Sequence, residues 1–298
     1  MTRKALIVAN PAVGGAALAA LQEALRRAFG LAGIDYEFHA TQPGENVGRA
    51  VAAARARGCG LVVAAGGDGT ISAVCEGLAD GAVPLGIVPI GTGNLVAREL
   101  GLPLEIGPAV ALIAAVPATR RIDAMRVGGR ICLLNVSVGI SARTVSDTSR
   151  RDKRRFGWLA YVGSAVLAVI GLRPRRLLVA VDGRALKLQA AEVTVMNCGL
   201  LARLLLLNGP PIRVDDGRLD VWVLRMRTLL DLPRYLFELA TGRGNRPLAR
   251  FLTAERSVVI RGRQPLPAQA DGDPIGTTPI EIELLPRAIP VIVPAGGR

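Results

Sequence analysis

Three glycine-rich segments in the first hundred residues each follow an apolar run and precede a helical pattern. They are NPAVGG at 10–15, GGDGT at 66–70 and GTGN at 91–94. Glycine lets a backbone approach a phosphate closely, and the free N–H groups at the start of the following helix favour an anion. Ordinary tight turns are the alternative, but three such segments at successive strand ends disfavour it. The segments therefore predict a site for a phosphorylated ligand.

Polar side chains in these segments indicate a nucleotide bound together with a metal ion. Thr70 and Thr92 offer hydroxyl donors, whereas Asp68 would repel a phosphate unless a cation lay between them. Carboxylate and phosphate oxygens are ligands that suit Mg²⁺. The segments match neither the Walker A pattern GxxxxGK[ST] nor the Rossmann fingerprint GxGxxG, so neither of those nucleotide sites is expected.

The remaining composition argues against several other chemistries. The single histidine, His39, disfavours a histidine-based catalytic triad and a histidine-rich metal site. The four cysteines lack CxxC spacing, which is typical of small buried residues in a reducing compartment. Half of the 298 residues are hydrophobic, which favours a large core and argues against global disorder.

The formal net charge of +13 favours anionic partners, namely nucleotides, nucleic acid or an anionic membrane. Aromatic residues make up only 3% of the chain, so stacking on bases and a nucleic-acid partner are not expected. The basic run RRDKRRFGW at 150–158 is either a solvated loop or a contact with anionic lipid head groups. The apolar stretch at 158–172 falls short of the roughly 20 residues that span a bilayer. We therefore expect a cytoplasmic protein that associates peripherally with the membrane.

Strand and helix patterns alternate through the first hundred residues and place each glycine-rich segment at a strand end. Apolar strand patterns cover 5–10, 36–41, 61–65 and 85–90, and helical patterns cover 16–29, 45–57, 70–79 and 95–100. This alternation indicates a mostly parallel sheet, and continuous apolar strands fit a sheet that is covered on both faces. Ligands of such sheets bind at the carboxyl ends of the strands.

After about residue 120 the pattern changes to short strands with few helices between them. The expected strands cover 121–127, 130–138, 175–182, 192–198, 219–225, 256–262, 280–285 and 285–295, and the expected helices cover 156–171 and 228–241. Such a series indicates an antiparallel β domain. The expected fold class is α/β plus β, with a nucleotide-binding domain at 1–125, a β-sandwich-like domain at 126–298 and a cleft between them. The strand at about 286–298 is expected to return to the first domain.

The three glycine-rich motifs, in this order and spacing, resemble the diacylglycerol kinase catalytic-domain family, whose bacterial lipid kinases are similar to diacylglycerol and sphingosine kinases. The acidic motifs PPIRVDDGRLDV at 210–221 and QADGD at 269–273 make the resemblance specific, because GGDGT alone also occurs in NAD kinases. Together with the stretch at 121–142, they extend it over nearly the whole chain. The resemblance implies an ATP-dependent kinase that phosphorylates a lipid hydroxyl, with diacylglycerol the first choice of acceptor and 126–298 the lipid-acceptor domain.

Individual site residues are implied by the resemblance. The implied ATP contacts are Asn10, Thr41, Gly66, Gly67, Asp68, Gly69, Thr70, Thr92 and Asn94. Phosphoryl transfer also needs a metal ion and a base near the acceptor hydroxyl. The implied base is Asp273, where the family more often has glutamate, and Asp271 is a second metal or water ligand. Which of these two acids is the base stays open.

The segment IRVDDGRLD at 212–220 resembles the family's structural Mg²⁺ site. The implied ligands are the Asp216 side chain and the backbone carbonyls of Arg213 and Arg218. An Asp-Gly pair by itself predicts a hairpin turn, and a turn can also hold a metal ion. Asp123 matches a family carboxylate linked to this network, although by itself it is more typical of a strand-end cap.

The chain departs from the family pattern at two places. Leu95 follows Asn94 where the family often has aspartate, which we interpret as a subfamily feature. The segment at 198–211 is unusually apolar and either belongs to the core or lines a lipid pocket. A soluble-acceptor kinase such as an NAD kinase and a non-catalytic lipid- or nucleotide-binding protein are the alternatives. The sequence allows a homodimer without fixing the oligomeric state.

Overall fold

The chain divides into two compact units, and a computed structural model describes most of each. The units comprise Met1–Ala124 with Leu285–Arg298, and Met125–Leu284. The described residues are 3–140, 142, 174–204, 211–226, 228, 230, 231, 233, 234, 237 and 248–296. No helix among them is long and apolar enough to cross a bilayer.

The first unit is built on a sheet of parallel strands. Its elements are β1 (Arg3–Ala9), η1 (Pro11–Val13), α1 (Gly15–Ala32), β2 (Ile34–Ala40), α2 (Val47–Ala56), β3 (Leu61–Gly66), α3 (Asp68–Cys75), β4 (Leu85–Pro89), α4 (Leu95–Glu99) and α5 (Ile106–Ala115). The strand order is β2-β1-β3-β4, with every pair parallel. The last part of β16 (Ile280–Val293) adds a further parallel strand, because Val291 pairs with Leu85 of β4.

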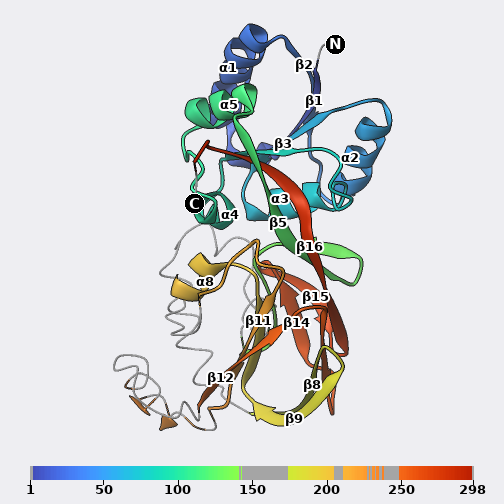
Figure 1. Ribbon diagram of the computed structural model, residues 1–298, viewed down its shortest axis with the longest axis vertical. Coiled ribbons are helices and arrows are strands. Elements are labelled where there is room, and N and C mark those ends of the chain that lie inside the picture. The colour runs from blue at the N-terminus through green and yellow to red at the C-terminus, as the bar shows by residue number, and fades with distance from the viewer. Residues whose placement is uncertain are drawn as a thin grey trace. The chain divides into compact units, whose positions relative to one another are not determined.

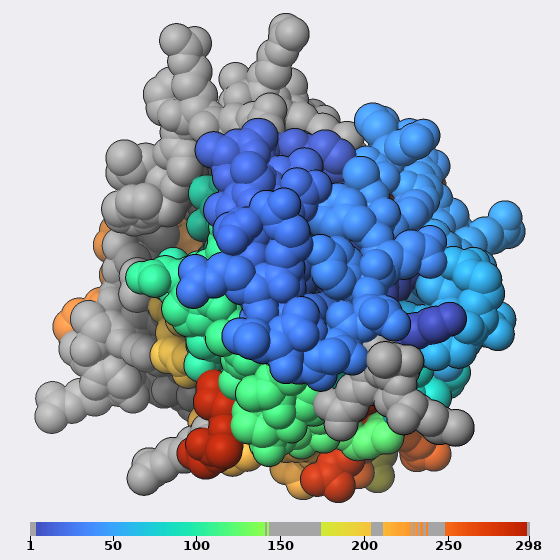
Figure 2. Space-filling view, turned by 90° about the horizontal axis from the view of Figure 1, so that it is seen from above, coloured from blue at the N-terminus to red at the C-terminus, as the bar shows by residue number. Residues whose placement is uncertain are grey.

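Helices cover both faces of this sheet (Figure 1). On one face, α1 and α5 pack together, and Leu21, Leu25 and Phe29 of α1 share a core with inward-facing residues of β1 and β3. On the other face, α2 packs against α3. All of β3 is buried, which explains its uninterrupted apolar sequence. The early part of the chain, in blue, forms the centre of the surface seen in Figure 2.

This unit confirms the expected mostly parallel α/β fold and adds a helix that the sequence patterns did not predict. That helix, α5, has the sequence IGPAVALIAA, in which every side chain is apolar or absent. Without polar positions, a helix has no amphipathic period to reveal it. Its residues Ala109, Val110 and Ile113 are buried against the sheet, so packing rather than pattern accounts for the helix.

The described part of the second unit consists almost entirely of antiparallel strands. Its elements are β5 (Ala118–Val127), β6 (Arg130–Cys132), β7 (Asn135–Gly139), β8 (Arg175–Val181), β9 (Arg184–Ala190), β10 (Glu192–Met196), α8 (Gly199–Leu204), β11 (Leu219–Leu224), β12 (Ala249–Ala254), β13 (Ser257–Gly262), β14 (Pro267–Ala270), β15 (Asp273–Thr277) and the first part of β16. β5 and β16 each continue from one unit into the other.

Two sheets of this unit form a sandwich. One has the order β16-β13-β8-β9, and the other has the order β12-β11-β10-β7-β14-β15. Alternate residues of the two sheets fill one apolar core, in which Val193 and Val195 of β10 join Val258 and Ile260 of β13. This arrangement confirms the expected antiparallel, sandwich-like domain.

Several strands differ from the sequence expectation. The expected strand at 130–138 is two strands, β6 and β7, and the two expected at 280–285 and 285–295 are the single strand β16. β9, β12, β14 and β15 were not expected, because polar or small residues break their apolar pattern. The expected helix at 156–171 and the basic run at 150–158 lie outside the described residues, as does most of 228–241.

Candidate active site

The glycine-rich segments lie at the carboxyl edge of the parallel sheet. Asn10 follows β1, and its N–H donates to the Ala65 carbonyl at 3.2 Å. Thr41 follows β2, and its N–H donates to the Ala9 carbonyl at 2.9 Å. Parallel neighbours end at the same edge, so the residues implied to bind nucleotide are gathered at one place in the first unit.

The GGDGT and GTGN segments touch each other backbone to backbone. A Cβ atom on Gly91 would collide with the Cα of Gly67, and one on Gly66 would collide with the Thr70 side chain. Gly91 is thus required by the contact between the two loops, and Gly66 by the packing of its own loop, apart from any phosphate. Close packing of the loops is therefore a second reason for glycine in these motifs, besides the approach of a phosphate. The sequence alone does not distinguish the two reasons.

Asp68 joins the two segments through its carboxylate. Its two oxygens accept the backbone N–H groups of Leu95 at 3.1 Å and Val96 at 3.0 Å. These are the first two residues of α4, so Asp68 satisfies N–H groups that a helix start leaves unpaired. The sequence predicts a metal ion beside Asp68, and nothing in its local pattern indicates this structural bond.

Asn94 closes the GTGN turn from inside. Its backbone is left-handed, with φ 49°, a conformation that asparagine tolerates better than most residues. Its Oδ1 accepts the N–H of Gly91 at 2.9 Å, and its Nδ2 donates to the Gly91 carbonyl at 2.8 Å. The side chain is buried, so it supports the loop from behind, while Thr92 is exposed on the loop itself.

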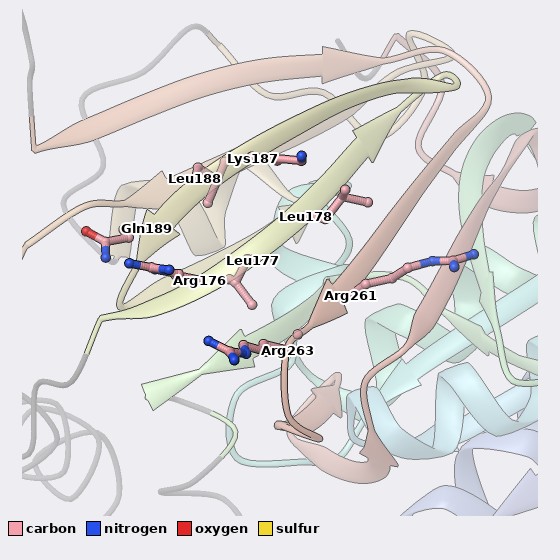
Figure 3. A pocket seen from close by; sticks show the side chains of 9 residues that line it. Arg176, Leu177, Leu178, Lys187, Leu188, Gln189, Arg261 and Arg263 are labelled. Atoms are coloured by element: carbon pink, nitrogen blue, oxygen red, sulfur yellow. The ribbon is translucent and has the colours of Figure 1, made fainter.

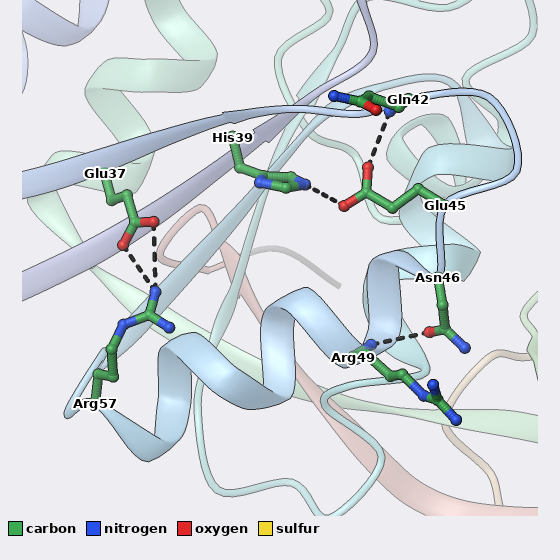
Figure 4. Close-up of polar contacts among 7 residues, drawn as sticks. All are labelled: Glu37, His39, Gln42, Glu45, Asn46, Arg49 and Arg57. Carbon is green, nitrogen blue, oxygen red and sulfur yellow. Dashed lines mark hydrogen bonds and ion pairs between the residues drawn. The ribbon is translucent and has the colours of Figure 1, made fainter.

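The loop after β2, which carries Thr41, is held by a histidine–carboxylate pair (Figure 4). His39 Nε2 lies 2.6 Å from Glu45 Oε1, and Glu45 Oε2 accepts the N–H of Gln42 at 2.9 Å. That backbone hydrogen bond lowers the pKa of Glu45 more than burial raises it, and His39 adds to the lowering. Asn46 then caps α2 by accepting the N–H of Arg49 at 2.9 Å. A lone histidine in the sequence gives no signal for this role of His39.

In the second unit, Asp271 is bonded to the backbone of a neighbouring segment. Its carboxylate accepts three consecutive N–H groups, from Leu133 at 2.9 Å and from Leu134 and Asn135 at 3.0 Å. Its own N–H donates to the Asn135 carbonyl at 2.9 Å. Asp271 therefore fixes the segment that leads into β7. These bonds do not test its expected role as a metal or water ligand.

Asp273, the expected base, is the first residue of β15 and lies two residues beyond Asp271. Its side chain is 48% exposed, and Arg130 Nη2 lies 3.8 Å from its Oδ2. An ion pair that is this exposed contributes little to stability, so the carboxylate can exchange partners when a substrate arrives. Arg130 was not among the expected site residues, although it lies in the stretch at 121–142 that shares the family resemblance.

The expected metal ligands Arg213, Asp216 and Arg218 lie in the turn before β11, and all three are exposed. Nearby, Asp220 is buried at the start of β11. Burial, and then the negative charge of Asp216, raise the pKa of Asp220 to about 6. The described residues contain no cluster of three acidic, histidine or cysteine side chains. A site here would therefore combine Asp216 with backbone carbonyls, which suits Mg²⁺, and its charge would offset the repulsion between the two acids.

Asp123 lies within β5 rather than at a strand end, and it is fully buried. Its Oδ1 accepts the N–H of Arg287 in β16 at 2.7 Å. This bond ties two strands of the first unit together. It gives Asp123 a structural role whether or not a metal network is present.

Two family models match consecutive parts of the chain. The model described as "Diacylglycerol kinase catalytic domain" matches residues 4–127. The model described as "YegS C-terminal NAD kinase beta sandwich-like domain" matches residues 134–293. The first match includes all the glycine-rich segments, and the second includes both acidic motifs.

Individual relatives agree with these matches. A Bacillus subtilis protein named "Diacylglycerol kinase" is 28% identical over 297 residues, which cover 98% of this chain and 97% of that protein. A Pseudomonas aeruginosa protein named "Probable lipid kinase YegS-like" is 32% identical over 265 residues, which cover 84% of this chain and 82% of that protein. A Bacillus anthracis crystal structure has the same fold, with a TM-score of 0.81 at 23% identity, and the match covers 99% of this chain and 96% of that one.

Proposed function

Because the chain belongs to the diacylglycerol kinase catalytic-domain family of lipid kinases, we propose that it transfers the γ-phosphate of ATP to the hydroxyl group of diacylglycerol. The family makes the protein a phosphotransferase with a hydroxyl acceptor. The choice of diacylglycerol is supported by the Bacillus subtilis relative, which bears that name and matches this chain over nearly its full length.

The observation that carries the proposal is the joined pair of glycine-rich loops. Asp68 and the contact between Gly67 and Gly91 hold two backbone turns together at the carboxyl edge of a parallel sheet. Backbone N–H groups and hydroxyl groups at such an edge are suited to phosphate oxygens. We assign the triphosphate to this edge, with Thr70 and Thr92 as hydroxyl donors, and the remaining contacts to Asn10 and Thr41.

The acceptor chemistry is assigned to Asp273. A kinase needs little covalent help beyond positioning, charge neutralisation and a group that takes the proton of the attacking hydroxyl. Asp273 is half-exposed, and its one ion-pair partner among the described residues is Arg130 at 3.8 Å, so it is available for that proton. Asp271 is engaged with three backbone N–H groups, which makes it the less suitable of the two acids.

Mg²⁺ is proposed at two places with different tasks. An ion bound with ATP would neutralise phosphate charge in the transferred group. A second ion would be held by Asp216 and the carbonyls of Arg213 and Arg218, close to the buried Asp220, whose pKa is raised to about 6 by burial and then by the charge of Asp216. This second ion would stabilise the turn before β11.

The test is transfer of label from γ-labelled ATP to defined acceptors. Diacylglycerol, monoacylglycerol, a sphingoid base and NAD are presented separately, with Mg²⁺ or with EDTA, and the products are identified. We expect label in phosphatidic acid, and only with Mg²⁺ present. Label in NAD, or in another lipid at a higher rate, would replace diacylglycerol as the acceptor. Nucleotide binding without transfer to any acceptor would favour a non-catalytic protein.

A further inference from the structure

A groove of about 810 Å³ lies on the second unit over β8, β9 and β13, and the proposed reaction does not use it (Figure 3). The strand register shows how it is built. Leu178 of β8 pairs with Lys187 of β9 and with Arg261 of β13. These three side chains form one row across the sheet.

A second row lies two residues further along the strands. Arg176 of β8 pairs with Gln189 of β9, and Arg263 follows the end of β13. Residues two apart on a strand share a face, so both rows lie on one side of the sheet. In Figure 3, Leu178 and Arg261 point to one side of the groove, whereas Arg176, Gln189 and Arg263 point to the other. The groove is therefore a strip of sheet bordered by long polar side chains.

Four of these six residues are cations, and no described acidic side chain pairs with them. Arg176, Lys187, Arg261 and Arg263 are all exposed. Acids of the same sheet lie further along on β16: Glu281 sits opposite Val259, and Glu283 already pairs with Arg126 at 2.9 Å. The face around the groove thus carries an unbalanced positive charge.

Protection of a sheet edge explains only part of this charge. Lysine and arginine on an edge strand prevent pairing with other chains, and β9 is an edge strand in this sheet. Arg176 and Arg261 lie on β8 and β13, which are paired on both sides and need no such protection. Cations on interior strands, grouped around an apolar centre at Leu178, indicate a surface that binds an anionic partner.

We propose that this cationic face, defined by Arg176, Leu178, Lys187, Arg261 and Arg263, docks on the anionic surface of the membrane that holds the lipid substrate. The proposal rests on the proposed lipid kinase function, because a kinase of this kind must reach an acceptor that stays in the bilayer. A broad sheet face fits a surface of head groups, and each basic residue near such a surface adds about 1 kcal/mol of attraction. Among the described residues, no aromatic side chain lines the groove, which disfavours stacking on nucleic-acid bases.

Vesicle co-sedimentation of the full chain tests the docking surface. Wild-type protein should bind phosphatidylcholine vesicles that contain phosphatidylglycerol and should not bind pure phosphatidylcholine. The double variant Arg176→Gln/Arg261→Gln should bind the anionic vesicles about 25-fold more weakly, at about 5-fold for each cation. The matched control Arg225→Gln/Arg250→Gln removes the same charge from exposed positions of the other sheet, at the end of β11 and in β12, and should retain most of the binding.

Three results would overturn the proposal. The first is wild-type binding to vesicles that does not depend on anionic lipid. The second is an equal loss of vesicle binding in the double variant and in its matched control. The third is a double variant that loses affinity for duplex DNA but keeps its affinity for anionic vesicles. A second pair, Lys187→Gln/Arg263→Gln, repeats the test if the first pair fails to fold. Transfer of phosphate to a soluble short-chain diacylglycerol is measured in parallel and should be unchanged in every variant. If the protein binds vesicles in a charge-dependent way but transfers no phosphate to diacylglycerol, the docking surface is supported and the proposed function is refuted.

Discussion

Two Asp-Gly turns of the second unit are built in the same way and differ in one residue. Asp182–Gly183 joins β8 to β9, and Asp271–Gly272 joins β14 to β15, with φ 48° at each aspartate and φ 85° and 84° at the glycines. Each aspartate accepts three consecutive backbone N–H groups from a distant segment, at 2.8–2.9 Å from 255–257 and at 2.9–3.0 Å from 133–135.

The two turns differ in the residue that follows the glycine. It is Arg184 after the first and Asp273 after the second. The aspartate and glycine of QADGD therefore perform the structural task that Asp182 and Gly183 perform at a turn outside every motif of the family resemblance. The comparison indicates that the chemistry of the motif resides in its last acid, and that the first two residues hold that acid in place.

Among substitutions that test the comparison of the two turns, the largest effect on activity is expected at Asp273. Asp273→Asn keeps the shape of the side chain and removes the base, so the rate of lipid phosphorylation should fall on the order of 10²- to 10⁴-fold. Arg184→Gln, the equivalent change at the other turn, should leave the rate within about twofold of wild type. The affinity for ATP, measured by equilibrium binding, should be unchanged in both. A mutant Asp273→Asn enzyme with normal turnover would place the base elsewhere.

Asp68→Ala should also abolish most activity, because it removes the carboxylate that joins the two glycine-rich loops. We expect weaker ATP binding together with a lower melting temperature, since two N–H groups at the start of α4 lose their acceptor at a cost of about 1–3 kcal/mol. Asp68→Asn, which retains one acceptor oxygen, should be affected less. Unchanged ATP affinity in the alanine variant would refute the assignment of the nucleotide to this edge.

A smaller and shared effect is expected from Asp182→Asn and Asp271→Asn. Each replaces a carboxylate that accepts three N–H groups, so each should lower the free energy of unfolding by about 1–3 kcal/mol. Only Asp271→Asn should also lower kcat, because Asp273 loses its support, and the Mg²⁺ concentration for half-maximal rate should not move. A shifted Mg²⁺ requirement with unchanged stability would instead identify Asp271 as a metal ligand.

The contribution of Asp182 should depend on pH. Burial acts to raise the pKa of Asp182, but the N–H groups of Glu255, Ser257 and Arg256, with the charge of Arg256, together lower it. A carboxylate with a lowered folded-state pKa stabilises the fold above its unfolded pKa of about 3.9 and loses that contribution as pH falls through the folded value. Denaturant titrations of wild type and Asp182→Asn should therefore differ most near pH 7 and converge in acid. A constant difference would mean that the charge has no role.

The smallest effect is expected at a third Asp-Gly turn, Asp216–Gly217. Among the described residues, the Asp216 carboxylate accepts no backbone hydrogen bond, so it is free for a cation. Mg²⁺ should raise the melting temperature of wild type by a few degrees, as expected for a ligand that binds only the folded state. The increase should be absent in Asp216→Ala. An equal increase in both proteins would place the ion elsewhere.

Much of the fold was predictable because its strongest elements carry regular patterns. The buried run LVVAAG of β3 and the period of α1 show their structure directly. The apolar helix α5 and the edge strand RALKLQA of β9 do not, because one lacks polar positions and the other is short, with polar residues at alternate positions and no continuous apolar run. In such segments tertiary packing decides the structure, and no local pattern records it.

The candidate site was predictable in its residues more than in their contacts. The sequence identified Asp68, Asp271 and Asp273 as acids of interest but could not show that the first two are bonded to backbone N–H groups of other segments. Partners 27 to 138 residues away leave no trace in local sequence. Arg130 beside Asp273 was missed for the same reason. The His39–Glu45 pair is only six residues apart in the chain, but a lone histidine gives no signal for its partner.

The continuous strand β16 sets an order of events during synthesis on the ribosome. Its last part supplies Val291 beside β4 and Ile292 in the core under α1 and α5, yet these residues are made after the whole sandwich has been translated. The parallel sheet formed by residues 3–89 must wait, with an unpaired edge at β4, until the ribosome reaches residue 291. An unpaired strand edge favours association with other chains. Nascent chains stalled before that point should therefore be the aggregation-prone species, and a chaperone that covers β4 would have its greatest effect there.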